Sequence, residues 1–566
     1  MKTRAAFLLP LALLAAVLHA ADDASPAPAS PEYTRVVIAS TTDLHGRIYP
    51  VDYFTELPFE GGLAKISTVV GELRRESPGL LLVDSGDTIE GNPLAYFHAQ
   101  RNNGPTDPMM LVMSRLGYDE MTLGNHDFNY GLAVQSKAQG EAKFPWLSAN
   151  IYRTDTGKPA YTPYLVKTVN GVRIGLLGLT TPGIPFWDAP ENYRGMEFHD
   201  PLPEARKWVA ILRNEEHVDA VVVTMHMGLE LIDLATGGTP VGAQPNENRA
   251  LAIANEVPGI DLILMGHTHK EIPALVVNGV LLAQAGRWGD HVIKAELFFS
   301  RPTAGAPWHL TGKQTAALTM RGVKPDPAIL ELTKSYHEET EQWLSRPIGT
   351  CDKEIDSRAI FADSAMLDLV HRVQLEVGGA DVSLASIFNP KATIHAGPVT
   401  VRDLAGLYVY DNTLVVIQVT GAQLKDALEH SARFLLPYQP GKTLNELIDP
   451  RVYSYNFDKA AGVSYELDIR RPYGDRIQHL TYQGAPLAPD KVLKLAVNSY
   501  RYNGGGRYDM LKGAPVLYRS SISMRDLMID WVEKHHTIPT EPMNNWRIVG
   551  VAADTKAPVS DRNITN

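Results

Sequence analysis

Short apolar runs that end in polar residues recur through the first half of the chain. Each run is rich in Val, Leu, Ile, Met and Ala, and its length suits a buried β-strand. In α/β folds ligands bind where the ends of neighbouring strands meet, so we expect the loops that follow these runs to lie together. The five runs are residues 36–39, 80–83, 121–123, 220–223 and 260–265.

The polar residues after these runs are oxygen and imidazole donors, with no thiolate among them. This donor set suits Zn, Mn or Fe rather than a soft metal. Two pairs of candidates are spaced two residues apart, so in an extended chain the side chains of each pair would point the same way. Seven candidates are too many for one tetrahedral zinc and suit two ions that share a carboxylate, the usual arrangement for hydrolysing phosphate esters. The candidates are Asp43, His45, Asp87, Asn125, His226, His267 and His269.

The second half of the chain begins with a segment that the pattern predicts to be a connecting helix, residues 322–346. Asp326 is a suitable N-cap, Pro327 fits the first helical position, and apolar residues then recur at helical spacing. Beyond it, helical segments mix with alternating strands such as 413–420 and 463–469. The chain therefore divides into a first domain at 33–321, a linker at 322–346 and a second domain at 347–552.

The first twenty residues follow the pattern of a secretory signal peptide. Lys2 and Arg4 give a positive start, an apolar run follows, and a small-residue cleavage point lies near Ala20. The apolar run is shorter than the ~20 residues that a membrane-spanning helix needs. We therefore expect residues 1–20 to be removed on export. The mature protein would carry a disordered leader at 21–32 and be soluble in the periplasm, without a membrane anchor.

Length and composition favour two ordinary globular domains. The chain has 566 residues, and single hydrophobic cores stop growing near ~250–300 residues. The net charge of −11 argues against a nucleic-acid polymer as a partner, because sequence-independent binding needs a basic surface. The single cysteine, Cys351, excludes a disulfide framework, an all-thiolate zinc site and an iron–sulfur cluster, and we expect it to be a buried thiol. Histidines outside the strand-end pattern are interpreted as surface residues: His98, His199, His291, His371 and His395.

The motifs DLHG, GDTIEGNP, GNHDFNYG, HMG and GHTH, in this order, resemble those of the calcineurin-like metallophosphoesterases. The chain looks like the periplasmic 5′-nucleotidase group and its relatives, the bifunctional 2′,3′-cyclic-nucleotide 2′-phosphodiesterase/3′-nucleotidases. The resemblance extends from about Tyr33 to Val551. It implies an α/β fold class, with an N-terminal metallophosphoesterase β-sandwich flanked by helices, an interdomain helix and a C-terminal α+β nucleotide-binding domain.

The resemblance also implies a role for each residue of the site. The cofactors would be two divalent metal ions, Zn, Mn or similar. His126 directly follows the metal-binding asparagine and so matches the family's catalytic histidine, which would stabilise the transition state and assist the leaving oxygen. One ion would be held by Asp43, His45, Asp87 and His269, and the other by Asp87, Asn125, His226 and His267, with Asp87 shared.

Two departures from the 5′-nucleotidases bear on the subfamily. In those enzymes an aspartate three residues after the catalytic histidine orients it, whereas this chain has Asn129. Asn129 carries no charge to hold an imidazolium, so either His126 has a lower pKa than in that branch or another carboxylate helps. The arginine cluster that grips the substrate is also missing, at residues 381–390. Both departures favour the cyclic phosphodiesterase branch, because a 2′,3′-linked phosphate does not present the 5′-phosphate geometry that such arginines serve.

Three stretches of the second domain resemble the family's nucleotide-binding domain: 407–414, 455–463 and 497–506. In relatives two aromatic residues in these stretches sandwich the base, and the matching residues here are Tyr410 and Tyr500. Stacking tolerates any base and contributes ~1–3 kcal/mol per base. Asn412 would reach the sugar or the base edge. The alternative is that both tyrosines are ordinary strand residues, and Tyr408 and Tyr502 are the neighbouring candidates for the same role.

We therefore expect an exported, dinuclear metal-dependent phosphoesterase that opens 2′,3′-cyclic nucleotides and then removes the remaining 3′-phosphate. Its partner would be a small-molecule nucleotide rather than a nucleic-acid polymer, and the protein would be a monomer. Two other enzyme classes stay open, a 5′-nucleotidase or UDP-sugar hydrolase and a sulfur-chemistry hydrolase with the same metal fold. From a different class, a non-catalytic nucleotide- or metal-binding protein stays open, although binding alone needs no bridged pair of metals.

Overall fold

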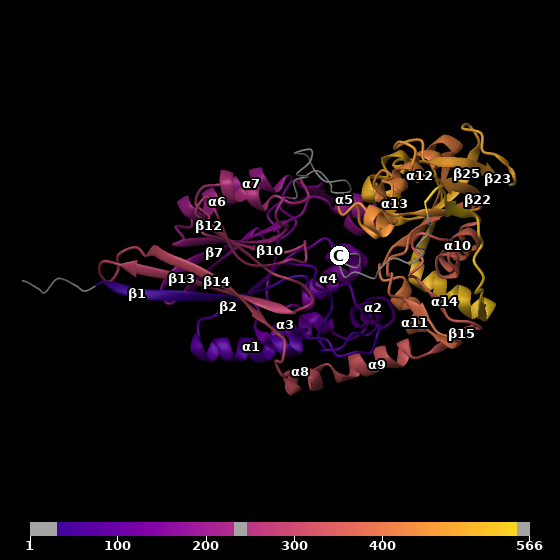
Figure 1. Cartoon of the computed structure of the whole chain (residues 1–566). Coiled ribbons are helices and arrows are strands. Elements are labelled where there is room, and N and C mark those ends of the chain that lie inside the picture. The colour runs from indigo at the N-terminus through magenta and orange to yellow at the C-terminus, as the bar shows by residue number, and fades with distance from the viewer. Residues whose placement is uncertain (1–30, 231–245, 552–566) are drawn as a thin grey trace, which may run out of the picture.

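The computed structural model describes residues 31–230 and 246–551, and these form two domains joined by a pair of helices (Figure 1). Strands β1 to β14 belong to the N-terminal domain and strands β15 to β28 to the C-terminal domain. Within the described residues, every sheet takes its strands from only one of the two domains. The signal-peptide segment and most of the leader expected at 21–32 lie outside the described residues.

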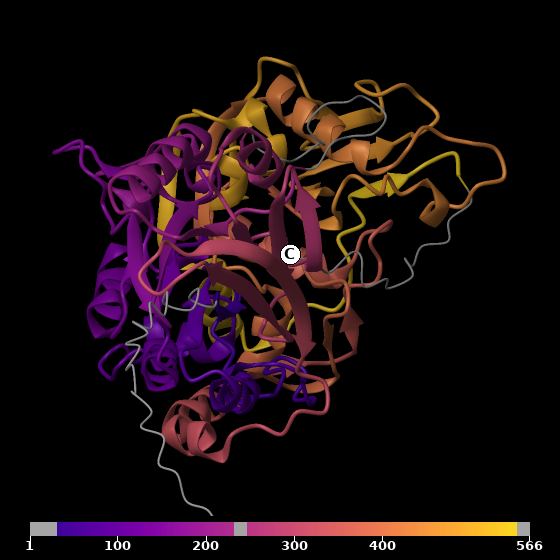
Figure 2. The same cartoon turned by 90° about the vertical axis from the view of Figure 1, so that its left-hand side faces the viewer.

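The N-terminal domain is a sandwich of two six-stranded sheets whose inner faces share one core. The first sheet has the order β14-β13-β1-β2-β3-β4 and the second the order β11-β12-β10-β9-β7-β6. The strands of the first sheet are β1 (Glu32–Thr41), β2 (Leu81–Asp84), β3 (Glu120–Thr122), β4 (Trp146–Leu147), β13 (His291–Arg301) and β14 (His309–Thr319). Those of the second are β6 (Tyr164–Val169), β7 (Val172–Thr180), β9 (Ala220–His226), β10 (Leu262–Met265), β11 (Glu271–Val277) and β12 (Val280–Ala285). Figure 2 shows the long strands β13 and β14 curving across one side of the domain.

All five strands predicted from the apolar runs are present, but they belong to two sheets rather than one. Strands β1, β2 and β3 are parallel neighbours in the first sheet, and β9 and β10 are parallel neighbours in the second. The two sheets meet near the strand ends, where Ser85 Oγ donates a hydrogen bond to the Leu264 carbonyl at 3.1 Å. The hydroxyls of Thr122 and Thr224 are also 2.8 Å apart across the sandwich. The five loops therefore come together at one end of the sandwich instead of at the edge of a single sheet.

Helices cover both outer faces of the sandwich, so the central parallel strands are buried on both sides and are mostly apolar. One face packs against α1 (Leu63–Glu76), α2 (Pro93–Gln100), α3 (Pro108–Leu116) and α4 (Gly131–Glu141). The other packs against α6 (Pro201–Asn214) and α7 (Ala250–Glu256). Smaller elements of this domain are β5 (Ile151–Arg153), β8 (Met196–Phe198) and α5 (Ile184–Trp187).

The connecting segment is helical as predicted, but it forms two helices, α8 (Pro327–Leu332) and α9 (Lys334–Leu344), rather than one. Asp326 caps α8 through its side chain, which accepts a hydrogen bond from the Ala328 amide at 2.9 Å, and Pro327 takes the first position. The break falls at Thr333, whose side-chain hydroxyl donates to the Ile329 carbonyl at 2.8 Å. Such a back-bond bends a helix, because it competes with the backbone ladder. Figure 1 shows the two helices along one side of the molecule, running from one domain to the other.

The C-terminal domain is built on a five-stranded sheet with the order β21-β17-β25-β20-β26. The strands predicted at 413–420 and 463–469 correspond to β20 (Thr413–Thr420) and β22 (Val463–Leu467). Its other main strands are β15 (Pro347–Cys351), β17 (Val382–Ala385), β19 (Gly397–Thr400), β21 (Lys459–Ala461), β23 (Ile477–Tyr482), β25 (Val492–Asn498), β26 (Val516–Ser523), β27 (Thr537–Ile538) and β28 (Trp546–Ile548). Its helices are α10 (Ala365–Gly378), α11 (Val401–Leu407), α12 (Gly421–Ser431), α13 (Ser499–Tyr502) and α14 (Met524–His535).

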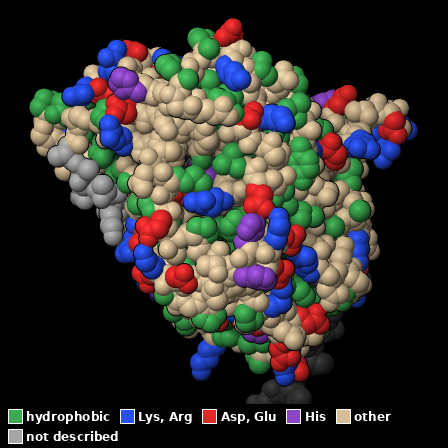
Figure 3. Space-filling view, turned by 90° about the vertical axis from the view of Figure 1, so that its right-hand side faces the viewer, with side chains coloured by type: hydrophobic (Ala, Val, Ile, Leu, Met, Phe, Trp, Pro, Cys, Tyr) green, Lys and Arg blue, Asp and Glu red, His purple; other side chains and the backbone are tan. Residues whose placement is uncertain are grey.

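The surface and the core of the described chain qualify three expectations. Cys351 is a buried free thiol, as predicted. The interpretation of His98 and His371 as surface histidines is wrong, because both are buried, His371 on the inner face of α10 beside Ser383. Acidic, basic and apolar side chains are interspersed over the face shown in Figure 3. Among the described residues, we find no helix with the length and apolar character that crossing a membrane requires.

Candidate functional site

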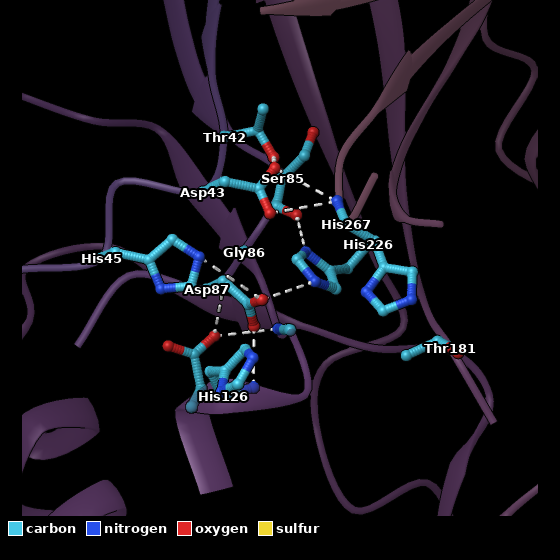
Figure 4. A network of polar contacts seen from close by, with 12 residues as sticks. Thr42, Asp43, His45, Ser85, Gly86, Asp87, His126, Thr181, His226 and His267 are labelled. Atoms are coloured by element: carbon cyan, nitrogen blue, oxygen red, sulfur yellow. Dashed lines mark hydrogen bonds and ion pairs between the residues drawn. The ribbon is translucent and has the colours of Figure 1, made fainter. Parts of the chain in front are cut away.

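All seven candidate ligands lie in the loops at the ends of β1, β2, β3, β9 and β10, where the two sheets of the N-terminal domain meet. Figure 4 shows side chains from these separate loops pointing toward a common centre. His, Asp and Glu atoms that could bind a metal gather there in two groups, and within each group they lie within 4.8 Å of one another. The first group is Asp43, His45 and His269, and the second is Asp87, His226 and His267.

The first group presents three ligand atoms to one point. His45 Nε2 lies 3.1 Å from His269 Nε2, and His269 Nε2 lies 3.3 Å from Asp43 Oδ1. The other ring nitrogen of His45, Nδ1, lies 3.1 Å from the backbone carbonyl of Glu90 and so donates to it. This outer hydrogen bond fixes the tautomer that leaves Nε2 of His45 free to bind a metal.

The second group is arranged in the same way. His226 Nε2 lies 2.9 Å from Asp87 Oδ2, while His226 Nδ1 lies 2.7 Å from the Ser85 carbonyl and donates to it. His267 Nε2 lies 3.0 Å from Glu247 Oε1, a carboxylate outside the group. Asp87 Oδ2 is also 3.9 Å from His45 Nε2, so Asp87 lies between the two groups.

The chemistry of these atoms fits a pair of divalent cations. Asn125 Oδ1 is buried without a hydrogen-bond partner, which is unusual for a polar atom inside a protein. Burial would raise the pKa values of Asp43 and Asp87, but the facing histidines outweigh it and hold both below the usual range. Burial lowers the pKa of His269 to about 4, which keeps its ring neutral as a metal ligand must be.

The loops that carry these residues adopt left-handed backbone conformations, and the expectation of extended pairs is wrong on this point. Asp43 and His45 have φ of 51° and 48°, and His267 and His269 have φ of 70° and 54°. Asp87 has φ of 57°. A non-glycine residue in this region costs of order 1–3 kcal/mol and is found where the surrounding structure over-determines it, often at functional sites.

Asp127 and Gly124 shape the loop that carries Asp87. The Asp127 carboxylate accepts hydrogen bonds from four backbone amides, including Asp87 at 3.1 Å and Gly124 at 2.8 Å. A Cβ atom at position 124 would lie 2.1 Å from Asp87 Oδ1, so only glycine permits this approach. Asn125 and His126, which follow Gly124, are thereby held against the Asp87 carboxylate, because the His126 amide donates to Asp87 Oδ1 at 2.7 Å.

His126 lies beside both groups, and two acceptors hold its ring. Its Nδ1 lies 2.6 Å from Asn129 Oδ1 and 3.3 Å from Glu90 Oε2. Burial opposes the charged ring, but the carboxylates of Glu90 and Asp87 outweigh it and raise the pKa of His126 to about 9. The sequence left two alternatives for a chain with Asn129: a lower pKa of His126, or help from another carboxylate. The structure has the second, because the Glu90 carboxylate contacts His126.

Aromatic side chains of the C-terminal domain form a cluster around Tyr455, which the sequence did not single out. Tyr410 and Tyr500 both lie edge-on to Tyr455, with ring centroids 6.4 Å and 6.5 Å away, and Tyr453 stacks on it at 5.2 Å. Tyr408 is buried in the core, and its hydroxyl accepts from the side-chain Nδ2 of Asn498 at 3.4 Å. This burial removes Tyr408 as an alternative to Tyr410.

The remaining candidates beside this cluster are Asn412 and Tyr502. Asn412 is half-buried directly before β20, and its backbone carbonyl accepts from the Met524 amide at 2.7 Å. The centroid of the Tyr502 ring lies 5.2 Å from the guanidinium carbon of Arg519.

Two buried arginines hold the aromatic cluster in place. Arg525 donates to the carbonyls of Tyr408 and Val409 at 3.2 Å and 3.1 Å, directly before Tyr410. Arg501 pairs with Asp458 at 2.6 Å, and its guanidinium lies 5.1 Å from the Tyr500 ring. The aromatic residues therefore stand on rigid, charge-assisted supports.

The cluster lies at the domain boundary. The Tyr130 hydroxyl of the N-terminal domain donates to Asp411, directly after Tyr410, at 3.0 Å, and Asn503, three residues after Tyr500, donates to the Asp188 carbonyl at 2.7 Å. Arg287 of the N-terminal domain lies 3.4 Å from His269 Nδ1 through Nη1.

Sequence reasoning missed five residues of this site: Glu90, Asp127, Glu247, Arg287 and Tyr455. Glu90 and Asp127 stand inside the quoted motifs, and Tyr455 stands at the start of a quoted stretch, so position within a motif was an available signal for them. Glu247 and Arg287 stand in no quoted motif, and nothing in the sequence marked either.

Comparison with known families divides the chain in the same two parts. Residues 36–271 match the family described as Calcineurin-like phosphoesterase. Residues 347–513 match the family described as 5'-nucleotidase, C-terminal domain.

Individual relatives extend over most of the chain. A 2',3'-cyclic-nucleotide 2'-phosphodiesterase/3'-nucleotidase from Salmonella typhimurium is 28% identical over 593 residues, which cover 92% of this chain and 89% of that protein. The Trifunctional nucleotide phosphoesterase protein YfkN of Bacillus subtilis is 27% identical over 99% of this chain, which spans only 41% of that longer protein. A solved Staphylococcus aureus structure, described as a 5'-nucleotidase, has a TM-score of 0.79 and 27% identity, covering 91% of this chain and 100% of its own.

Proposed function

Because this chain is a calcineurin-like phosphoesterase with a 5′-nucleotidase C-terminal domain, we propose that it hydrolyses 2′,3′-cyclic nucleotides. Water would add across the 2′-oxygen–phosphorus bond to give a 3′-nucleotide with a free 2′-hydroxyl. A second water would then release the 3′-phosphate and leave the nucleoside. The observation that carries this proposal is the convergence of two metal-type ligand groups and His126 in the N-terminal domain, which the C-terminal domain contacts next to Tyr410 and Tyr500.

Two divalent cations such as Zn or Mn are the proposed cofactors. Asp43, His45, Asp87 and His269 would hold one of them, and Asp87, Asn125, His226 and His267 the other. When bound, such a pair lowers the pKa of water and offsets the charge of the phosphoryl group. The buried Asn125 Oδ1 supports this assignment, because it lacks a hydrogen-bond partner in the described structure.

His126 is proposed to act on the leaving oxygen. With Nδ1 held by Asn129 and Glu90, the ring can carry a proton at Nε2 and deliver it as the ester bond breaks. The Glu90 carboxylate, 3.3 Å from Nδ1, favours the protonated ring. The charged ring would also stabilise negative charge that develops on the phosphoryl oxygens.

Tyr410 and Tyr500 are proposed to hold the nucleobase, with Asn412 at the sugar or base edge. Both rings lie edge-on to the Tyr455 ring between them, and this arrangement supports an aromatic surface that would face the ligand groups. Stacking accepts every base, so this surface would bind nucleotides without strong base preference.

The choice of 2′,3′-cyclic over 5′-nucleotides rests on two features of the sequence, Asn129 and the absent arginine cluster at 381–390. Relatives named as cyclic phosphodiesterases support it at 28–29% identity over most of the chain. The main alternative is a 5′-nucleotidase or UDP-sugar hydrolase, because a protein named UshA is 26% identical to the chain.

The experiment that tests the proposal compares turnover of 2′,3′-cAMP, 3′-AMP and 5′-AMP by purified protein loaded with Mn²⁺ or Zn²⁺. The expected order places the first two substrates ahead of 5′-AMP. A preference for 5′-AMP or a UDP-sugar would instead support the alternative enzyme. Tight nucleotide binding without phosphate release under any metal would support the non-catalytic alternative.

We also propose that the chain is exported to the periplasm as a monomer. The positive and apolar start of the sequence supports export. Sequencing the N-terminus of protein from the periplasmic fraction tests the first point, with a start near Ala21 expected. Light scattering of the purified protein tests the second.

A further inference from the structure

We propose that Glu90 is the positioning residue for His126, supplying the charge that Asn129 lacks. The inference rests on the proposed function only in that His126 takes part in phosphoester hydrolysis, whichever ester is the natural substrate. Glu90 has no assigned role from the sequence, since it is neither a metal-type ligand nor part of the aromatic cluster.

The position of Glu90 suits this role. It follows β2 in the loop that carries Asp87, and it is 4% exposed. Its Oε2 lies 3.3 Å from His126 Nδ1, and within the described chain no other carboxylate lies within 4.0 Å of a ring nitrogen of His126. The buried carboxylate therefore faces the same ring nitrogen that Asn129 holds.

Asn129 and Glu90 do different things for the same nitrogen. Asn129 Oδ1 accepts from Nδ1 at 2.6 Å, and its own amide donates to Asp188 Oδ2 at 3.2 Å, which fixes which end of the amide faces the histidine. An amide sets direction, but a charged acceptor roughly doubles the strength of such a contact. An aspartate at position 129 would supply both direction and charge from one side chain. In this chain Asn129 supplies the direction and Glu90 supplies the charge.

Glu90 is itself held from the other domain. Its side chain lies beside that of Asp411, the residue after Tyr410, and burial raises the pKa of Asp411 to about 7, so Asp411 can carry the proton that a contact between two carboxyl groups requires. Asp411 in turn accepts from the Tyr130 hydroxyl at 3.0 Å and pairs with Arg525 at 2.9 Å. Packing from both domains thus leaves the Glu90 carboxylate one place to lie, next to His126.

The backbone of Glu90 has a separate task, so its side chain can be tested alone. The carbonyl of Glu90 accepts from His45 Nδ1 at 3.1 Å, whereas its carboxylate is 3.6 Å from the same atom. Glu90→Gln keeps the backbone and the volume and removes only the charge. Metal content measured beside activity separates an effect on His126 from an effect on His45.

The experiment uses the full metal-loaded protein and an aryl phosphate ester, a substrate that does not depend on nucleotide recognition. Glu90→Gln should lower kcat by about tenfold to a hundredfold and leave KM and metal content unchanged. Asn129→Asp in the same background should restore kcat at least severalfold, because it returns a carboxylate to Nδ1. Glu197→Gln is the matched control: Glu197 Oε2 lies 3.5 Å from His199 Nε2 at an exposed place outside the site, and its loss should leave kcat unchanged.

A second measurement does not depend on turnover. In protein labelled with ¹⁵N-histidine, the Nδ1 proton of His126 should resonate far downfield, and His126→Ala identifies its signal. Glu90→Gln should move that signal upfield, and adding Asn129→Asp should move it back.

The proposal is overturned if Glu90→Gln keeps wild-type kcat and an unmoved resonance, if it loses metal in proportion to activity, or if Asn129→Asp restores neither readout. If the wild type cleaves the aryl ester but not 2′,3′-cyclic nucleotides, the substrate assignment fails while the role of Glu90 is still decided by these readouts.

Discussion

Asn503 of the C-terminal domain donates a 2.7 Å hydrogen bond through Nδ2 to the backbone carbonyl of Asp188 in the N-terminal domain. The side chain of Asp188 accepts from the Asn129 amide, whose oxygen receives the Nδ1 proton of His126. A contact between domains is thus only two residues away from the proposed catalytic ring.

We predict that Asn503→Ala lowers kcat a fewfold without changing metal content, because Asp188 and Asn129 lose their anchor. Steady-state kinetics with an aryl phosphate measure the effect. Lys512→Ala is the control, since Lys512 also contacts the other domain, 4.9 Å above the Phe186 ring, but has no link to His126. An equal loss of kcat in both variants would mean that contact between the domains in general supports activity, and that the path from Asn503 through Asp188 and Asn129 to His126 has no specific effect.

His126→Ala is expected to lower kcat by ~10²-fold or more while the protein keeps its metal. The ring supplies a proton and charge but belongs to neither ligand group. Kinetics and metal analysis on the same samples check both parts. His395→Ala, an exposed histidine of the other domain, should be indistinguishable from wild type. Full activity in His126→Ala would remove the residue from the mechanism.

Gly124→Ala is expected to abolish tight metal binding, because the added Cβ would lie 2.1 Å from Asp87 Oδ1. Titration calorimetry with Mn²⁺ measures the loss, and the rise of Tm on adding metal should shrink with it. Gly140→Ala is the matched control: it lies in α4 of the same domain, and its Cβ would meet no atom within 4 Å. Normal metal affinity in Gly124→Ala would contradict the assignment of Asp87.

Tyr410→Ala and Tyr500→Ala are expected to raise KM for nucleotides roughly 5- to 150-fold, the equivalent of ~1–3 kcal/mol of stacking per base. KM for a small aryl phosphate should change far less, because that substrate has no base. Tyr518→Ala, which removes an exposed tyrosine of β26, is the control. Equal effects on both substrates would exclude base stacking.

Acid should destabilise the fold partly through His371, whose burial lowers its pKa to about 3. Below pH 6.5 the unfolded chain binds a proton at this histidine that the folded chain does not, so stability falls as pH falls. The loss approaches about 1.4 kcal/mol per pH unit and stops below the folded pKa. Urea unfolding at pH 7 and pH 5 in the presence of a chelator should show a smaller pH effect for His371→Asn than for wild type. The same slope in both would show that His371 does not titrate this way.

Much of the site was readable from the sequence because apolar runs identify buried strands and polar residues mark their ends. Asp43, Asp87 and His226 were found on that ground alone, and each follows or ends a strand as predicted. The division of the strands between two sheets was not readable, since a buried parallel strand has the same apolar pattern in either sheet.

Other features depend on contacts that no local pattern records. The left-handed turns at His45 and His269 are imposed by neighbouring loops, whereas local preference alone disfavours them. The break at Thr333 depends on one side-chain hydrogen bond inside an otherwise helical pattern. Arg287 reaches His269 only because the loop after β12 folds back over the end of β10.

The proposed metal centre joins parts of the chain that are synthesised at different times. His45 and His269 are 224 positions apart in sequence, yet their Nε2 atoms lie 3.1 Å apart. Contacts of such long range form late in folding, because closing the intervening loop is entropically costly. Neither proposed ligand group exists until both sheets are assembled, so metal uptake would follow completion of the N-terminal domain. The ion that the protein acquires would then be selected in the compartment where folding ends, and not by the order in which its ligands are synthesised.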